Sequence, residues 1–176
     1  MAHTTQEVLT NMARSARGEA VVSSDTTQDR RSLAVIRIAL GAMFVWVFFE
    51  NYHKGAYAPA GYRGVIEYYL KSGHAPAAWK SVMSFVAGHA SVAAPLQAIT
   101  ELSLGLALVT GTASRLAAAA AAGYLFTLWL SELGAAWIWE LLLPTIAAAA
   151  LALTRPGRTW GIDALLSRRW PNVPIW

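Results

Sequence analysis

Four long apolar runs constrain this chain more than any other feature of its sequence. They cover Leu33–Tyr52, Val92–Gly111, Leu116–Leu133 and Ala136–Thr154. Each is close to the roughly 20 residues that an α-helix needs to cross about 30 Å of hydrocarbon. Because backbone groups inside a bilayer must bond to one another, a helix is expected for each run. The runs predict an all-α fold, an integral membrane four-helix bundle formed by residues 33–154.

Composition supports this class. Of the 176 residues, 56% are apolar and only 14% are charged, whereas an ordinary soluble domain carries about a quarter charged residues. The net charge of +4 comes from basic residues that flank the apolar runs, so it indicates contact with membrane lipid rather than with nucleic acid. The absence of cysteine excludes disulfides, thiolate metal sites and sulfur carriage on a thiol.

The basic residues also predict the orientation of the chain. If the N-terminus is cytoplasmic, only Lys54, Arg63, Lys71 and Lys80 lie on the outer side. The cytoplasmic side then holds nine arginines: Arg14, Arg17, Arg30, Arg31, Arg115, Arg155, Arg158, Arg168 and Arg169. This bias follows the positive-inside tendency, so both termini are expected to be cytoplasmic. The predicted location is the cell (inner or plasma) membrane, with several passes. A cleaved signal is not favoured, because bulky residues rather than a small-residue cleavage site end the first run.

Three segments lie outside the predicted spans. Residues 1–32 are polar and show no sustained period, which predicts a disordered or loosely structured cytoplasmic head, with room for a short helix near its start. The outer loop, 53–91, carries apolar residues at helical spacing in GYRGVIEYYLKSG and APAAWKSVMSFVAG, which predicts two short amphipathic helices. The tail, 155–176, is too charged to span and predicts an interfacial helix near Ile162–Arg168.

Three charges lie deep inside the predicted spans. Counted from the middle of each run, Glu101 lies at the midplane and Arg37 lies about 7 Å towards the cytoplasm. Glu140 lies about 7 Å towards the outside on the same scale. Charges at such depth point into the bundle and pair with one another. An ion pair between Arg37 and Glu101 is therefore the first pairing that the sequence predicts.

A second group of charges lies near the outer boundary. Glu50 and Glu132 lie about 12 Å from the midplane, and His53 and Lys54 follow at the end of the first run. An outer charge cluster that joins Glu132 and Glu140 with His53 or Lys54 is the corresponding hypothesis. The alternative for both groups is that the charges only orient the helices or reach water at helix ends.

These residue types match what the reduction of a quinone requires. The sequence offers Glu101, Glu132 and Glu140 as protonatable groups and Arg37 as a cation for a ring oxygen. Aromatic side chains for stacking on the ring are Phe48, Tyr124, Trp129 and Trp139. No metal-ligand set and no flavin or dinucleotide fingerprint is visible, so electrons would come from a partner. No histidine lies inside a run, which argues against haem, and His74 and His89 are expected to be exposed in the outer loop.

The motifs resemble those of the DoxX/DoxD family of four-helix membrane proteins. The resemblance is carried by RIALGAMFVWVF, by TELSLGLALVTGTASRLAA and by RPGRTWGIDALL, and it covers roughly residues 33–167. The long outer loop and the WGID ending favour the DoxD-like branch, which is similar to the membrane subunit of thiosulfate:quinone oxidoreductase. The resemblance implies a membrane subunit that handles quinone beside a second, thiosulfate-handling subunit.

Three functions remain open at this point. The first is a catalytic subunit, with Glu101, Arg37 and Glu140 as catalytic residues and Arg37, Phe48, Tyr124, Trp129 and Trp139 around the quinone. The second is a non-catalytic accessory or anchoring subunit of a membrane (respiratory) complex. The third, transport of a small solute or proton, is the least favoured, because no inverted repeat of the kind found in transporters is visible.

Overall fold

The computed structural model describes residues 2–171 and 173 of the chain, with side chains described from residue 27 onwards. The described residues are helical and contain no strand, which confirms the all-α prediction. The elements are α1 (Ala2–His53), α2 (Pro59–Ser72), α3 (Ala77–Gly88), α4 (Ala90–Thr110), α5 (Ser114–Glu132), α6 (Ile138–Ala152), the 3-10 helix η1 (Pro156–Arg158) and α7 (Asp163–Arg169). The two short helices expected between residues 53 and 91 are thus present as α2 and α3, and the tail helix is present as α7.

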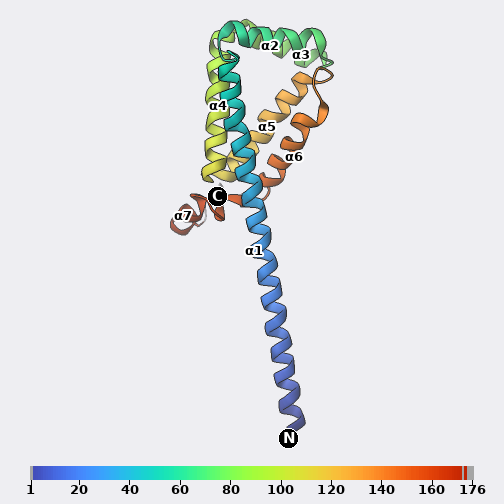
Figure 1. Cartoon of the computed structure of the whole chain (residues 1–176), viewed down its shortest axis with the longest axis vertical. Coiled ribbons are helices and arrows are strands. Elements are labelled where there is room, and N and C mark those ends of the chain that lie inside the picture. The colour runs from blue at the N-terminus through green and yellow to red at the C-terminus, as the bar shows by residue number, and fades with distance from the viewer. Residues whose placement is uncertain (1, 172, 174–176) are drawn as a thin grey trace.

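The long helices form two pairs. α1 packs along α4, and α5 packs along α6. Figure 1 shows that the pairs meet near α7 and diverge towards the opposite end, where α2 and α3 lie across them. The molecule therefore has an α7 end, where all four long helices converge, and an α2/α3 end, where space is left between the pairs.

Two helical segments in the described part of the chain are long and apolar enough to cross a membrane, Thr27–His53 of α1 and all of α4, Ala90–Thr110. A third apolar helix, α6, is shorter. These segments coincide with the first, second and fourth apolar runs. The third run forms α5, which is rich in alanine.

The α1–α4 contact depends on two glycines that face each other. A Cβ atom added to Gly41 would lie 2.7 Å from the backbone nitrogen of Val109 and 2.9 Å from the carbonyl oxygen of Gly105. A Cβ atom added to Gly105 would lie 2.8 Å from a methyl group of Val45. The absence of side chains at both positions lets the two backbones approach closely, as small residues do in helix pairs of membrane proteins.

The core surrounds this crossing and extends to the other helix pair. It is formed by leucine, phenylalanine and alanine side chains from all four long helices. The members are Leu40, Phe44, Leu104, Leu108, Ala117, Ala118, Ala121, Leu125, Ala148 and Leu151. The alanine-rich face of α5 brings α6 close, so that the α5–α6 pair is as compact as the α1–α4 pair.

The head differs from its prediction. Residues 2–32, expected to be loosely structured, continue α1 as one helix that projects past the bundle (Figure 1). The segment has no proline and a single glycine, Gly18. Because adding a residue to an existing helix is much easier than nucleating a new one, the apolar segment propagates the helix into this polar sequence.

Candidate functional site

A cavity of about 660 Å³ lies between the two helix pairs at the α2/α3 end. Helices α1 to α6 all contribute to its walls, which are largely aliphatic and aromatic. Four carboxylates also line it, namely Glu50, Glu101, Glu132 and Glu140. Its size falls in the range of small-molecule sites. An apolar lining with a few polar groups is also typical of such sites.

Glu101 is the most buried of these carboxylates, with 1% of its surface exposed. Its Oε1 accepts hydrogen bonds from Gln97 Nε2 at 3.0 Å and from the hydroxyl of Tyr124. Its Oε2 accepts from Asn51 Nδ2 at 3.3 Å and from the hydroxyl of Tyr57. The donors come from α1, the α1–α2 turn, α4 and α5, so one carboxylate joins three long helices and the segment above them.

The arrangement suits a carboxylate held without a counter-ion. A carboxylate has about four lone-pair positions and no donor, and here four donors face it. The described residues include no ion pair of Glu101. Hydrogen bonds from neutral groups therefore replace water around this side chain, and they fix its position at the cavity wall.

Three tyrosines from the segment above the bundle keep their protons. Burial, together with the hydrogen bond to Glu101 and its negative charge, raises the pKa of Tyr57 well above its usual value. Burial and the charge of Glu101 likewise raise the pKa of Tyr62, which lines the cavity. Burial raises the pKa of Tyr69, with further contributions from Glu132 and Glu140. Their hydroxyl groups therefore act as hydrogen-bond donors at physiological pH.

Glu132 and Glu140 lie on the far wall of the cavity. Tyr69 of α2 is hydrogen-bonded to Glu132, and Glu140 is near enough to interact electrostatically with both residues. Tyr69 thus connects α2 to the two carboxyl groups on this wall.

Contacts between connecting segments hold α2 and α3 over the cavity. The backbone nitrogen of His74 donates to the carbonyl oxygen of Leu133 at 2.5 Å, which joins the α2–α3 connection to the α5–α6 connection. Trp79 Nε1 of α3 donates to the hydroxyl of Ser131 on α5 at 2.9 Å. These contacts make the upper wall of the cavity part of the fold rather than a loose loop.

The predicted ion pair between Arg37 and Glu101 is wrong. Arg37 Nη1 donates to the carbonyl oxygen of Leu108 at 2.6 Å, and its Nη2 donates to that of Trp160 at 2.9 Å. Arg37 is fully buried at the α7 end. Glu101 precedes Leu108 by seven residues, about 10 Å along α4, and meets Asn51 of α1 instead. The sequence prediction took the middle of each apolar run as the same depth, and this assumption underestimated the separation of the two charges.

A second buried carboxylate, Asp163, completes the α7 end. Its carboxylate accepts hydrogen bonds from the backbone nitrogens of Ala113 and Ser114 at 2.7 and 2.8 Å and from the Ser114 hydroxyl at 2.5 Å. The start of α5 has no side-chain cap from its own sequence, because Ala113 at the N-cap position has no acceptor in its side chain. Asp163 thus supplies the missing N-cap from 49 residues further along the chain.

The predicted quinone-binding residues are dispersed. Tyr124 lines the cavity, where it donates to Glu101 rather than only offering a ring for stacking. Phe48 packs on the ring of Tyr57, with centroids 5.5 Å apart, behind the cavity wall. Trp129 packs on Phe126, and neither it nor the exposed Trp139 lines the cavity. With Arg37 at the other end, the five residues do not line one cavity.

The outer charge cluster forms only in part. Lys54 makes an ion pair with Glu50 at 2.6 Å. Glu50 lies one helical turn earlier, at the end of α1, and both side chains are exposed. His53 Nδ1 lies 2.6 Å from the carbonyl oxygen of Phe49 on its own helix. Neither residue pairs with Glu132, which bonds to Tyr69. Lys54 nevertheless lines the same cavity as the four carboxylates.

Sequence reasoning missed several of the residues that build these sites, namely Asn51, Tyr57, Tyr69, Ser114 and Asp163. No sequence signal pointed to Asp163, because the segment GTASRLAA contains Thr112 and Ser114, and both residue types can cap a helix start locally. None pointed to Tyr57 or Tyr69 either, because tyrosines near a membrane boundary are common.

The chain was compared with protein-family models, with curated proteins and with solved structures, and none of them matches it.

Proposed function

We propose that this chain is a multi-pass membrane subunit of a quinone-linked oxidoreductase, DoxD-like, with four spans formed by α1, α4, α5 and α6. A partner subunit would supply the electrons, because no described group of histidine and acidic side chains is suited to hold a metal ion and the chain has no flavin or dinucleotide fingerprint. In this proposal the cavity at the α2/α3 end holds the quinone ring, and the isoprenoid tail leaves between the two helix pairs into lipid.

One observation carries the proposal: a buried carboxylate held by four neutral donors lies at the wall of a cavity that is otherwise mostly apolar. Such a group is expensive to keep in hydrocarbon and is expected to have a functional role. The cavity also fits the ligand, because a quinone ring needs apolar walls and donors for its oxygens. Tyr62 and Lys54 offer such donors.

Conversion of a quinone to a quinol consumes two electrons and two protons. The residues of this chain would provide the protons. The carboxyl groups of Glu132 and Glu140 would pass two protons in turn to the quinone oxygens and would regain them from water. Glu101 would keep the hydroxyl groups of Tyr124 and Tyr57 in place at the cavity wall. Tyr69 would orient Glu132, since it donates to that carboxylate at any physiological pH.

The test measures quinone binding, because the electron donor is unknown. The purified full chain in mild detergent is titrated with a short-tailed benzoquinone, and bound quinone is measured by equilibrium dialysis. Glu101→Gln is expected to weaken binding about tenfold or more, because the amide points a donor at four donors and the wall rearranges. Tyr124→Phe removes one donor and is expected to have a smaller effect in the same direction.

The matched control is Glu67→Gln, an exposed glutamate on α2 that does not line the cavity. It is expected to bind quinone like the unchanged chain. Equal binding by Glu101→Gln, with its fold verified by circular dichroism, would remove the cavity from the proposal.

A second candidate is a non-catalytic accessory or anchoring subunit of a membrane complex. The observation that favours it is the projection of α1 past the bundle, which offers a long helix for docking a partner (Figure 1). Absence of quinone binding by the unchanged chain, with recovery of a stable larger complex in mild detergent, would favour this role.

A further inference from the structure

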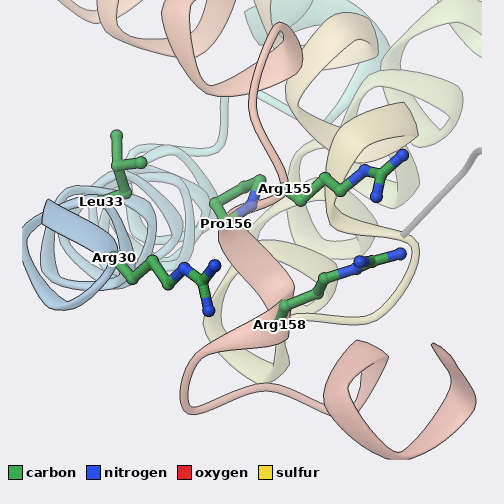
Figure 2. Close-up of a pocket in the computed structure, with 5 residues that line it drawn as sticks. All are labelled: Arg30, Leu33, Arg155, Pro156 and Arg158. Carbon is green, nitrogen blue, oxygen red and sulfur yellow. The ribbon is translucent and has the colours of Figure 1, made fainter. Parts of the chain in front are cut away.

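A second cavity, of about 320 Å³, lies at the α7 end and is lined by Arg30, Leu33, Arg155, Pro156 and Arg158. Arg30 and Leu33 come from α1, and the other three residues come from the segment that leaves α6 and forms η1. Figure 2 shows the side chain of Arg30 reaching from α1 towards η1, with Arg155 and Arg158 extending in one direction from η1 and its start. The cavity is separate from the one that contains Glu101.

Three arginine side chains line this cavity, and the described residues that line it include no acidic side chain. In Figure 2 the guanidinium groups of Arg155 and Arg158 extend away from that of Arg30. Within the described residues, the only ion pair joins Lys54 and Glu50. The Nε atom of Arg158 is buried and has no hydrogen-bond partner in the structure. Arg30 and Arg155 are exposed, and no acidic side chain in the described lining balances the positive charge of the three arginines.

Arg37, on α1 beyond Leu33, differs from the three cavity arginines in its terminal nitrogens, although its buried Nε atom, like that of Arg158, has no hydrogen-bond partner. Its two terminal nitrogens reach four backbone carbonyl oxygens, those of Leu108, Val109, Thr159 and Trp160. Among the described residues, no such hydrogen bond from the side chains of the three cavity arginines is found. They are therefore available for a ligand, whereas Arg37 is committed to the fold.

We propose that this three-arginine cavity binds a phosphate group. Guanidinium groups present paired N–H donors at a spacing that matches two phosphate oxygens, and several of them around one site favour a multiply charged oxyanion over a single carboxylate. The phosphate can belong to a phospholipid headgroup or to a soluble compound. Leu33 in the wall, and Leu153 two residues before Arg155 with 85% of its surface exposed, offer apolar contacts for an acyl chain beside the arginines.

The proposal does not depend on quinone chemistry and is tested by binding alone. The full chain in mild detergent is titrated with inorganic phosphate by calorimetry. In parallel, native mass spectrometry measures retention of phosphatidylglycerol and phosphatidylcholine. The pocket variant Arg155→Gln/Arg158→Gln is compared with Arg168→Gln/Arg169→Gln, which removes the same charge from two exposed arginines of α7 that do not line the cavity.

We expect the pocket variant to bind at least one of the probes about tenfold more weakly, equivalent to about 1.4 kcal/mol, and the α7 variant to bind like the unchanged chain. Loss of inorganic phosphate binding would identify a soluble source, and loss of lipid retention alone would identify a headgroup. Equal effects of the two double variants, or no binding of any probe, would overturn the proposal. If the pocket variant does not fold, Arg30→Gln tests the same cavity from α1 and leaves η1 intact.

Discussion

Two buried acidic side chains show how the same residue type takes different roles in one fold. Glu101 and Asp163 both have almost no exposed surface. Asp163 accepts from backbone N–H groups at the start of α5, so it completes a helix end. Glu101 accepts only from side chains, among them two tyrosine hydroxyls at a cavity wall. Side-chain donors can move with a ligand, whereas backbone donors cannot, and this difference supports a structural role for Asp163 and a functional role for Glu101.

Replacing Asp163 tests the structural role. Asp163→Asn leaves one oxygen to serve three donors and turns an amide N–H₂ towards them. Because the site is fully buried, the free energy of unfolding is expected to fall by about 2–3 kcal/mol, as for the loss of hydrogen bonds to charged groups. The measurement is the thermal unfolding midpoint of the purified chain in detergent, followed by circular dichroism.

The control for this change is Asp29→Asn, at an exposed position of α1. It removes the same charge and is expected to leave the midpoint unchanged. A midpoint for Asp163→Asn equal to that of the control would mean that the start of α5 needs no cap from the tail.

At the scale of the elements, much of the architecture could be predicted from the sequence. The four apolar runs coincide with α1, α4, α5 and α6, and the helical spacing between residues 53 and 91 corresponds to α2 and α3. Apolar periodicity reports helices because it depends only on local spacing. The relative shift of two helices along their axes depends on how their surfaces fit, which is why the sequence wrongly predicted that Arg37 pairs with Glu101.

The register of α1 against α4 is set where Gly41 meets Gly105. Gly41→Ala would place a Cβ atom 2.7 Å from the backbone nitrogen of Val109, and backbone atoms cannot rotate away. The helices would have to separate, and the free energy of unfolding is expected to fall by about 1–3 kcal/mol. The thermal unfolding midpoint is the measurement, and a fall is expected although alanine favours helix formation more than glycine does.

Gly123→Ala on α5 is the matched comparison. It makes the same chemical change in a helix interior, where nothing lies within 4 Å of the added Cβ atom. Its midpoint is expected to stay the same or to rise, because only helix propensity changes. If both variants behave alike, the close approach of α1 and α4 does not set the register.

At the scale of the whole molecule, the two cavities lie at opposite ends of the bundle and differ in charge. The α2/α3 end gathers four carboxylates around a mostly apolar space, whereas the α7 end gathers three arginines around a smaller one. The sequence predicted the arginine excess at one end from flanking charges. It could not predict either cavity, because each combines residues from segments more than 80 positions apart, such as Asn51 with Glu140 and Arg30 with Arg155.

This polarity leads to a prediction about topology, which the chain allows to be tested cleanly because it has no cysteine. Ser72→Cys lies at the exposed end of α2, and Ser32→Cys lies at an exposed position of α1. If the α7 end is cytoplasmic, a membrane-impermeant maleimide added to intact cells should label the first cysteine and not the second. Lysed cells should label both, since both positions are exposed. Because the two serines lie beyond opposite ends of the apolar part of α1, labelling of both in intact cells would mean that this helix does not span the membrane. Labelling of Ser32→Cys alone would reverse the orientation and place the arginine cavity outside, away from the anionic cytoplasmic leaflet that would supply a phospholipid headgroup.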